Sequence, residues 1–441
     1  MKPLYAKLLL IPVLIFLTNA VYPQQDSIVL SLDDAVNLAL DNNTEVSVAE
    51  QSVESAEFAK KEAVGNFLPK LYLSANYFRN INRPVIFLPD IFDMGNTATK
   101  LGSLNDYRAS LNIAVPVYSN QNQHNKKLAD TQLDYQKETA RYARQQVTNA
   151  TKKAYFNYLI AQEVVAVQQK QLENAEDILV DIKKRRRLGT TTDHDLTAAK
   201  VQVSQAKSSL LEAQNNIMPL ANTLKLLLNL EPDQNLKLTE PIAVIQEELI
   251  VDVDMETMLE DNSVLKQLAL EVEMNKNQIK MEKSAYYPTL EAIGNYNFQA
   301  QEDGFDVAHY DWVNTSLVGL QLQFSIFNGN ITKNRVKQAE IKQRIAEEEK
   351  AHTSKDYQMQ LQELRSKLDF ASKKINVQHE NMNLTEEALA LARKRYDFGV
   401  GTFLEVNDAV LSYTQARLSW LQAISEYKVA YYDYQLLLGE D

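Results

Sequence analysis

The residue types that most often carry out chemistry are few and scattered in this sequence. Five histidines occur without HExxH or any comparable metal-ligand spacing, at His124, His194, His309, His352 and His379. Cysteine is absent, which excludes disulfides, thiolate metal sites, a cysteine nucleophile and a lipid-anchoring thiol. Gly399 and Gly401 lack the third glycine and the preceding strand of a dinucleotide-binding loop. The sequence therefore predicts no enzyme, no cofactor and no metal site.

Two acidic side chains, Glu405 and Asp408, stand three residues apart near the start of an expected helix. At this spacing both carboxylates lie on one helix face. The helix dipole favours acidic residues in a first turn, which would explain the pair without any site.

A basic run, KKRRR at 183–187, raises the question of nucleic-acid binding. The whole chain carries 46 Lys and Arg against 58 Asp and Glu, a net charge of −12, whereas nucleic-acid binding depends on a basic surface. Cations at the end of a helix are favoured by its dipole. We therefore expect no nucleic-acid partner. His194, beside Asp195, is either a pH-sensitive group or a solvated turn residue.

The first twenty residues have the pattern of a secretory signal peptide. Lys2 and Lys7 precede an apolar run at 8–17, and Ala20 ends a small-residue cleavage site. The alternative, an N-terminal membrane anchor, needs roughly 20 apolar residues, and this run has ten. The mature chain is then either soluble outside the cytoplasm or inserted in a membrane as strands.

The remainder of the chain is duplicated. The segments RRLGTTTDHDLTAA (186–199) and YDFGVGTFLEVNDA (396–409) align at an offset of 210, and Pro69 matches Pro288 at an offset of 219. We expect a first repeat at 21–230, an inter-repeat equatorial segment at 231–250 and a second repeat at 251–441. The expected strands are at about 68–79 and 107–118, then 288–299 and 313–327, and the expected helical hairpins are at about 120–230 and 330–438.

Long helices follow from the absence of helix breakers. The stretches 120–188 and 330–398 each contain 69 residues without Gly or Pro, enough for a helix about 100 Å long. Apolar and small residues recur with the 3.5-residue period of a supercoiled seam, both before and after the turn at Gly189 or Gly399. Each repeat is therefore predicted to end in an antiparallel coiled-coil hairpin.

The four predicted strands are too few to close on themselves. Their residues alternate in polarity, and aromatic residues gather at their ends, as in outer-membrane barrels. An ordinary soluble sheet is the alternative. A bilayer tolerates no open sheet edge, so strands in lipid would need further copies of the chain, and three copies would supply twelve strands. The competing protein class is a soluble periplasmic coiled-coil adaptor or scaffold without a pore.

The duplicated order of elements resembles the TolC family of outer-membrane efflux and secretion channels. The resemblance is carried by FLPKLYLSANYF (67–78), YYPTLEAIGNYNF (286–298) and, above all, FGVGTFLEVNDAVLSYTQARLSWLQAISEYKVAYYDYQLLLG (398–439), and it covers nearly the whole mature chain. It implies a mainly α fold with β-strands, in which a homotrimer forms a twelve-stranded β-barrel that continues into an α-helical barrel. It also implies localisation in the Gram-negative outer membrane and a passive channel gated at its periplasmic tip.

The same resemblance implies partners and site residues. The partners are outer-membrane lipid, a periplasmic adaptor (membrane fusion) protein and an inner-membrane transporter of RND or ABC type, in a tripartite efflux pump or a type I secretion system. Glu405 and Asp408 match the acidic pore constriction, with Glu405 in place of the aspartate common at the first position. Asp195 matches a position that links hairpins, with Tyr396 or Arg395 as its expected partner. The residues that resemble adaptor-contacting tips are Leu188, Gly189, Thr190, Gly399, Val400, Gly401 and Thr402.

Overall fold

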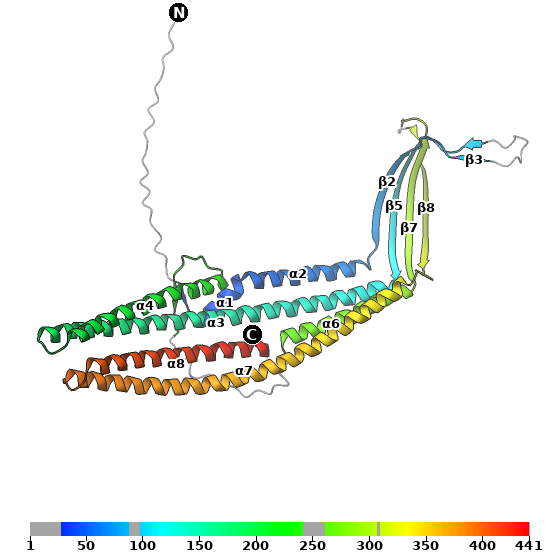
Figure 1. Ribbon diagram of the computed structural model, residues 1–441. Helices are drawn as coiled ribbons and strands as arrows, with labels where there is room; N and C mark the ends of the chain where they lie inside the picture. Colours follow the sequence, from blue (N-terminus) through cyan, green and yellow to red (C-terminus); the bar gives the residue numbers. More distant parts are fainter. Residues whose placement is uncertain (1–27, 88–97, 241–260, 307–308, 441) are drawn as a thin grey trace, which may run out of the picture.

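The computed structural model describes residues 28–87, 98–240, 261–306 and 309–440. The molecule is elongated: its helices lie side by side along one axis, and a four-stranded sheet stands at one end of them (Figure 1). Both hairpins end together at the opposite end of the molecule. The predicted signal peptide at 1–20 lies outside the described residues.

Two very long helices dominate the structure. Helix α3 (Asn120–Arg187) has 68 residues and α7 (Ile331–Asp397) has 67, and each turns back into a shorter helix, α4 (Asp193–Leu227) or α8 (Phe403–Leu438). The glycines at the turns, Gly189 and Gly399, have φ of 76° and 73°, which glycine adopts without a Cβ clash. The predicted fold class, mainly helical with strands and duplicated, is confirmed.

The predicted hairpin seams are largely buried, which explains why two such long helices remain paired. Buried seam residues of the two hairpins include Val147, Ala154, Ile182, Ala199, Ala206, Val406, Ala416, Ala423 and Ala430. Helix α7 also carries a second, solvent-exposed apolar stripe at seven-residue intervals, formed by Phe370, Val377, Leu384 and Leu391. Within the part of the chain that the structure describes, nothing covers this stripe.

Shorter helices continue the line of the returning helices. Helices α1 (Leu32–Asn42) and α2 (Thr44–Gly65) meet the end of α4, while α6 (Ser263–Lys283) meets the end of α8. At the first junction Asn43 accepts a hydrogen bond from the Glu45 N–H at 2.8 Å and donates one to the Leu227 carbonyl at 3.1 Å. One side chain thus satisfies both the first turn of one helix and the last turn of another.

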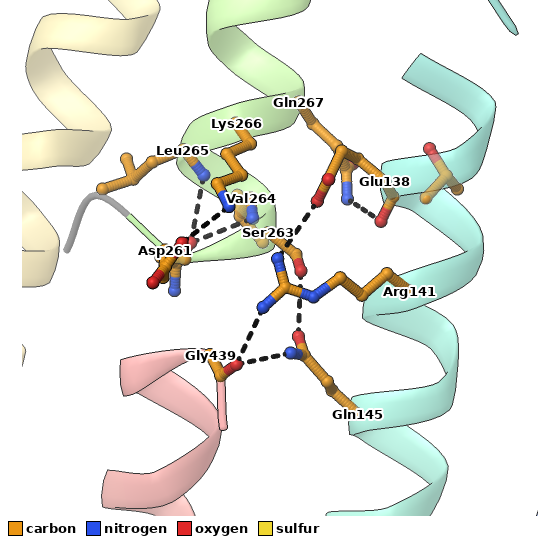
Figure 2. Close-up of polar contacts among 12 residues, drawn as sticks. Glu138, Arg141, Gln145, Asp261, Ser263, Val264, Leu265, Lys266, Gln267 and Gly439 are labelled. Carbon is orange, nitrogen blue, oxygen red and sulfur yellow. Dashed lines mark hydrogen bonds and ion pairs between the residues drawn. The ribbon is translucent and has the colours of Figure 1, made fainter. Parts of the chain in front are cut away.

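The second junction is drawn in Figure 2, where α3, α6 and α8 meet. The Gly439 carbonyl, at the end of α8, accepts hydrogen bonds from Gln145 at 2.7 Å and Arg141 at 3.1 Å. Ser263, in the first turn of α6, donates to the Gln145 side chain at 3.0 Å. A Cβ on Gly439 would lie 2.9 Å from the Asp261 carbonyl, so the close approach of the two helix ends requires glycine.

The main sheet has the order β2 (Lys70–Arg79), β5 (Asn105–Tyr118), β7 (Thr289–Glu302) and β8 (Val313–Gln323), with every neighbouring pair antiparallel. Two strands come from each repeat. The edge strands β2 and β8 therefore run antiparallel to each other, and both are exposed along almost their whole length. Each edge leaves a row of backbone groups without strand partners.

The register separates an apolar face from a polar face of this sheet. One cross-strand row contains Leu71, Ile113, Gly294 and Val318, and the neighbouring row, on the other face, contains Tyr72, Asn112, Asn295 and Leu317. On the polar face the hydroxyls of Ser74 and Ser110 lie 2.7 Å apart, and Asn295 donates to Asn112 at 2.5 Å. The apolar face includes solvent-exposed Leu73, Leu320 and Leu322.

Two short strand pairs and one 3₁₀ turn were not predicted from the sequence. Strands β1 (Ile28–Leu30) and β6 (Leu236–Leu238) form a parallel pair, and the buried Tyr155 hydroxyl donates to the Leu30 carbonyl at 3.1 Å. Strands β3 (Val85–Phe87) and β4 (Ala98–Lys100) form a ribbon within the β2–β5 connection. The 3₁₀ turn η2 (Ser284–Tyr286) joins α6 to the sheet.

Among the described residues, no helix has both the length and the apolar composition needed to cross a membrane.

Candidate functional site at the hairpin ends

The first hairpin turns through a short backbone network. The N–H of Gly189 donates to the Arg186 carbonyl at 3.1 Å, and the N–H of Thr190 donates to the Arg185 carbonyl at 3.0 Å. Thr192 then begins α4, because its hydroxyl accepts a hydrogen bond from the Asp195 N–H at 3.2 Å. These hydrogen bonds satisfy the backbone of the turn, and the residues at 188–190 are exposed to solvent.

The second hairpin has a tighter turn. The N–H groups of Val400 and Gly401 both donate to the Arg395 carbonyl, at 2.9 and 3.0 Å. A Cβ on Gly401 would lie 2.9 Å from the Tyr396 nitrogen, so only glycine fits this position without a backbone shift. Thr402 accepts from the Glu405 N–H at 3.2 Å and begins α8. The sequence alone did not reveal the steric requirement at Gly401.

The outer surface of the two turns is apolar. Leu188 on the first turn and Phe398 and Val400 on the second have 78, 84 and 69 % of their surface exposed. Exposed large apolar side chains grouped at one place are typical of a protein-binding surface. The residues predicted to contact an adaptor thus lie at the free end of the molecule, where a partner can reach them.

Asp195 is held by its own turn. Its carboxylate accepts hydrogen bonds from the Thr192 hydroxyl at 2.8 Å, the Thr192 N–H at 3.2 Å and the Thr191 hydroxyl at 2.9 Å. These bonds, chiefly those from Thr192, hold the pKa of Asp195 below its ordinary value. The side chain is therefore a carboxylate at neutral pH, and part of it remains accessible.

Tyr396 is held by the first hairpin through a residue that the sequence analysis did not single out. The Arg185 guanidinium lies 4.3 Å from the centre of the Tyr396 ring and donates to the Tyr396 carbonyl at 3.4 Å. The same guanidinium forms an ion pair with Asp181 at 2.7 Å. Burial raises the pKa of the Tyr396 hydroxyl, which stays protonated at neutral pH.

Arg395 and Glu405 form an ion pair at 3.5 Å that spans the second hairpin, and the Arg395 side chain also donates to the Val400 carbonyl at 3.4 Å. Glu405 and Asp408 are both exposed, one turn apart on α8. Within one chain the structure thus pairs Arg395 with Glu405, and Tyr396 with Arg185. The Asp195 carboxylate is bound by Thr191 and Thr192 of its own turn.

The repeat itself contains a sequence signal for Arg185. At the repeat offset of 210, Arg185 is the counterpart of Arg395 and Asp195 is the counterpart of Glu405. The helix dipole explains the basic run KKRRR as a whole and does not distinguish Arg185 from its neighbours. Within the part of the chain that the structure describes, no three His, Asp or Glu side chains are placed to hold a metal ion.

Comparison with known proteins places this geometry in context. The family model "Outer membrane efflux protein" matches residues 35–230 and 255–440. No curated protein matches the chain. The CusC channel structure is 16 % identical, with a TM-score of 0.76, and the match covers 93 % of this chain and 92 % of that one. The Campylobacter jejuni CmeC outer membrane channel is 17 % identical with a TM-score of 0.74, and the match covers 92 % of this chain and 85 % of that one. The Vibrio cholerae outer membrane protein VceC is 17 % identical with a TM-score of 0.73, and the match covers 93 % of this chain and 96 % of that one.

Proposed function

The chain belongs to the outer membrane efflux protein family, and from this premise we propose that three copies assemble into one duct that is gated at the hairpin ends. The protein is an exit duct of the outer membrane that extends into the periplasm. Its family is one of efflux proteins and not of enzymes. The family match gives no support to the alternative of a soluble periplasmic adaptor.

The main support for a trimer is that both edge strands of the sheet, β2 and β8, lack a strand partner on one side within the described residues. Because β2 and β8 are antiparallel, β8 of one copy can pair with β2 of the next and leave no edge exposed to lipid. Two copies would give eight strands, a barrel that side chains nearly fill, whereas three give twelve strands and room for a water-filled lumen. The apolar face then contacts lipid and the polar face lines the duct.

The helices support the same closure. Within one chain α3 lies beside α4 and α8, and α8 lies beside α7, so the ring order is α4, α3, α8, α7. The next neighbour of α7 in a ring is α4 of another copy. The exposed α7 stripe would there meet the exposed apolar residues of α4, which are Val201, Leu211 and Met218. The two sets lie at similar distances along the helices from the hairpin turns.

The same ring order gives the predicted gate residues their partners. Asp195 lies in the first turn of α4 and Arg395 in the last turn of α7. These two helices are at opposite ends of the row α4, α3, α8, α7 within one copy, and the ring would make them neighbours across the boundary between copies. We infer that Asp195 of one copy pairs with Arg395 of the next. Tyr396 lies against the first hairpin of its own copy, where burial and, to a smaller extent, the Asp195 charge raise the pKa of its hydroxyl. Glu405 and Asp408, exposed on α8, would line the constriction as rings of carboxylates.

The exposed apolar side chains at the hairpin ends suit the binding of a partner protein in the periplasm. We propose that Leu188, Gly189 and Thr190, together with the segment 399–402, bind the adaptor protein, which joins the duct to an inner-membrane transporter of RND or ABC type. A duct that performs no chemistry must draw its driving energy from such a transporter. The lining of the strands gives no indication of one particular substrate.

The experiment that tests this function is direct. The protein is extracted from outer-membrane fractions, examined by gel electrophoresis without heating, and inserted into planar lipid bilayers. A heat-stable species of three times the chain mass that conducts ions supports the proposal. A monomer in the soluble periplasmic fraction, or trimers that never conduct, would contradict it.

A further inference from the structure

A cavity lies at the place where α8 and α6 meet. These two helices lie end to end between α3 and α7 (Figure 1), and their junction leaves a space of about 340 Å³ that α3, α7, α8 and the N-cap residue of α6 line. Small-molecule sites have volumes of about 300–1,000 Å³. Residues of the lining include Tyr142 of α3, Tyr357 and Glu363 of α7, and Asp433, Leu436 and Leu437 of α8.

Three polar groups of this lining form no hydrogen bond or ion pair within the described residues. They are the hydroxyls of Tyr142 and Tyr357 and the carboxylate of Glu363. Burial raises the pKa of the Tyr357 hydroxyl, with a smaller contribution from Tyr142, so this hydroxyl is neutral at pH 7. Asp433, in contrast, forms an ion pair with Lys153 of α3. The cavity therefore combines two aromatic rings with one carboxylate that has no ion-pair partner.

The first repeat lacks this chemistry at the equivalent positions. At the repeat offset of 210, an apolar, a basic and a hydroxyl residue replace the tyrosine and the two acids: Val147 for Tyr357, Lys153 for Glu363 and Thr223 for Asp433. Leu436 and Leu437, however, are leucines in both repeats, and both junctions have a capping asparagine. Joining the helix ends therefore does not require the tyrosine or the acids.

The cavity opens on the face of α8 that carries the predicted constriction. Asp433 stands four heptads after Glu405, and Leu436 stands four heptads after Asp408. In a supercoiled helix, residues a whole number of heptads apart share one face. At 1.5 Å per residue the cavity lies about 42 Å further along the helix. In the proposed trimer, where Glu405 and Asp408 line the duct, the cavity opens into the duct.

We propose that this cavity binds small organic cations that have an aromatic or apolar body. The ring faces of Tyr142 and Tyr357 attract the cation, and Glu363 supplies the opposite charge. Leu436 and Leu437 contact the apolar body of the ligand. The position of the site in the wall of the duct rests on the proposed function, whereas binding by the purified protein does not depend on it.

Phenyltrimethylammonium, a ring with a permanent positive charge, is the probe for this site. Its comparison is N,N-dimethylaniline, which has one methyl group fewer and is neutral at pH 8. Binding of each compound to the purified, detergent-solubilised full chain is measured by ligand-observed NMR titration. We expect the cation to bind and the neutral compound to bind more weakly.

Variants of the lining test which residues hold the cation. We expect Glu363→Gln to weaken binding about fivefold, because a nearby unit charge contributes about 1 kcal/mol. Tyr357→Leu should weaken it about two- to tenfold, whereas Tyr357→Phe keeps the ring and should stay within about twofold of the wild type. Glu380→Gln, an exposed position about 25 Å further along α7, is the matched control and should leave the affinity unchanged.

Three results would overturn the inference. The first is equal binding of the charged and the neutral compound, and the second is equal affinity in the wild-type and Glu363→Gln proteins. The third is binding that is lost in the Glu405→Gln/Asp408→Asn protein and kept in Glu363→Gln, because the cation would then bind at the hairpin ends.

The absence of cysteine allows a test of where the site lies. Gln360→Cys places a thiol in the lining, and we expect a charged thiol reagent to change the single-channel conductance of this variant. Phenyltrimethylammonium at a concentration equal to its Kd should slow that reaction about twofold and leave the reaction of Glu380→Cys unchanged. A conducting trimer whose Gln360→Cys thiol reacts without a change in conductance would overturn the placement in the duct and leave the proposed function intact. A chain that binds the probe but forms no conducting trimer would contradict the proposed function and support the site.

Discussion

Asn262 donates its side-chain amide to the Leu437 carbonyl at 2.8 Å and thereby joins the first turn of α6 to the last turn of α8. Its side-chain oxygen accepts hydrogen bonds from the N–H groups of Val264 and Leu265. Asn43 does the same between α2 and Leu227 in the first repeat. The duplication therefore extends to the junction at which two shorter helices meet end to end.

The first prediction concerns this junction. Asn262→Ala should destabilise the protein by about 1–3 kcal/mol, because it leaves buried helix-end groups without partners. Asn43→Ala should cost less, because Asn43 is less completely buried, with 9 % of its surface exposed against 2 % for Asn262. Thermal unfolding followed by circular dichroism measures both. Asn381→Ala, on the exposed surface of α7, is the control, and an equal loss in all three variants would refute the junction's role.

The second prediction concerns closure of the duct. Asp195→Ala removes the proposed contact between copies as well as three local hydrogen bonds, and Tyr396→Phe removes the hydroxyl while it keeps the ring on which Arg185 stacks. We expect single-channel conductance to rise in both variants, and more in Asp195→Ala. If both channels conduct as the wild type does, these residues do not hold the gate.

The third prediction concerns ion selectivity. Glu405→Gln combined with Asp408→Asn should lower the preference for cations about two- to fivefold, because a unit charge a few ångströms away contributes about 1 kcal/mol in water. Reversal potentials in a salt gradient report this ratio. Glu54→Gln, an exposed position on α2 far from the hairpin ends, should have no effect. An unchanged ratio in the double variant would place the selectivity elsewhere.

The fourth prediction concerns assembly. Val377→Asp places a charge in the middle of the exposed α7 stripe, and we expect it to abolish the heat-stable trimer, since a buried unpaired charge is very unfavourable. Asn383→Asp adds the same charge to a different face of the same helix and should leave the trimer intact. Gel mobility without heating separates the two outcomes, and a trimer that survives Val377→Asp would show that this stripe is not an interface.

The fifth prediction concerns pH. The hydrogen bonds from Thr192 lower the pKa of Asp195 below its unfolded value of about 3.9. The stabilisation they give the first turn is therefore complete above that value and is lost as the pH falls through the lower, folded value. Hydrogen exchange at 190–196 should stay slow from about pH 8 to pH 5, after correction for the intrinsic rate, and Thr192→Val should bring the loss to a higher pH. Loss of protection already near pH 6 in the wild type would contradict this assignment.

The sequence by itself determined the repeat, the long helices and the alternating strands, because these depend on local periodicity and on the absence of helix breakers. The turns at Gly189 and Gly399 followed from the same pattern and adopt the expected positive φ. The polarity of the strand faces was also readable, since a period of two assigns every second residue to one face.

Only the tertiary structure decided which charged side chains meet. Arg185 and Arg395 occupy equivalent places in the two repeats, yet one contacts Tyr396 of the other hairpin and the other pairs with Glu405 of its own. The cause lies in neighbouring residues, because Arg186 and Asp193 already close the first hairpin. The contact between Arg185 and Tyr396 joins residues 211 positions apart in the chain. It depends on distances of a few ångströms, and no periodicity encodes those distances.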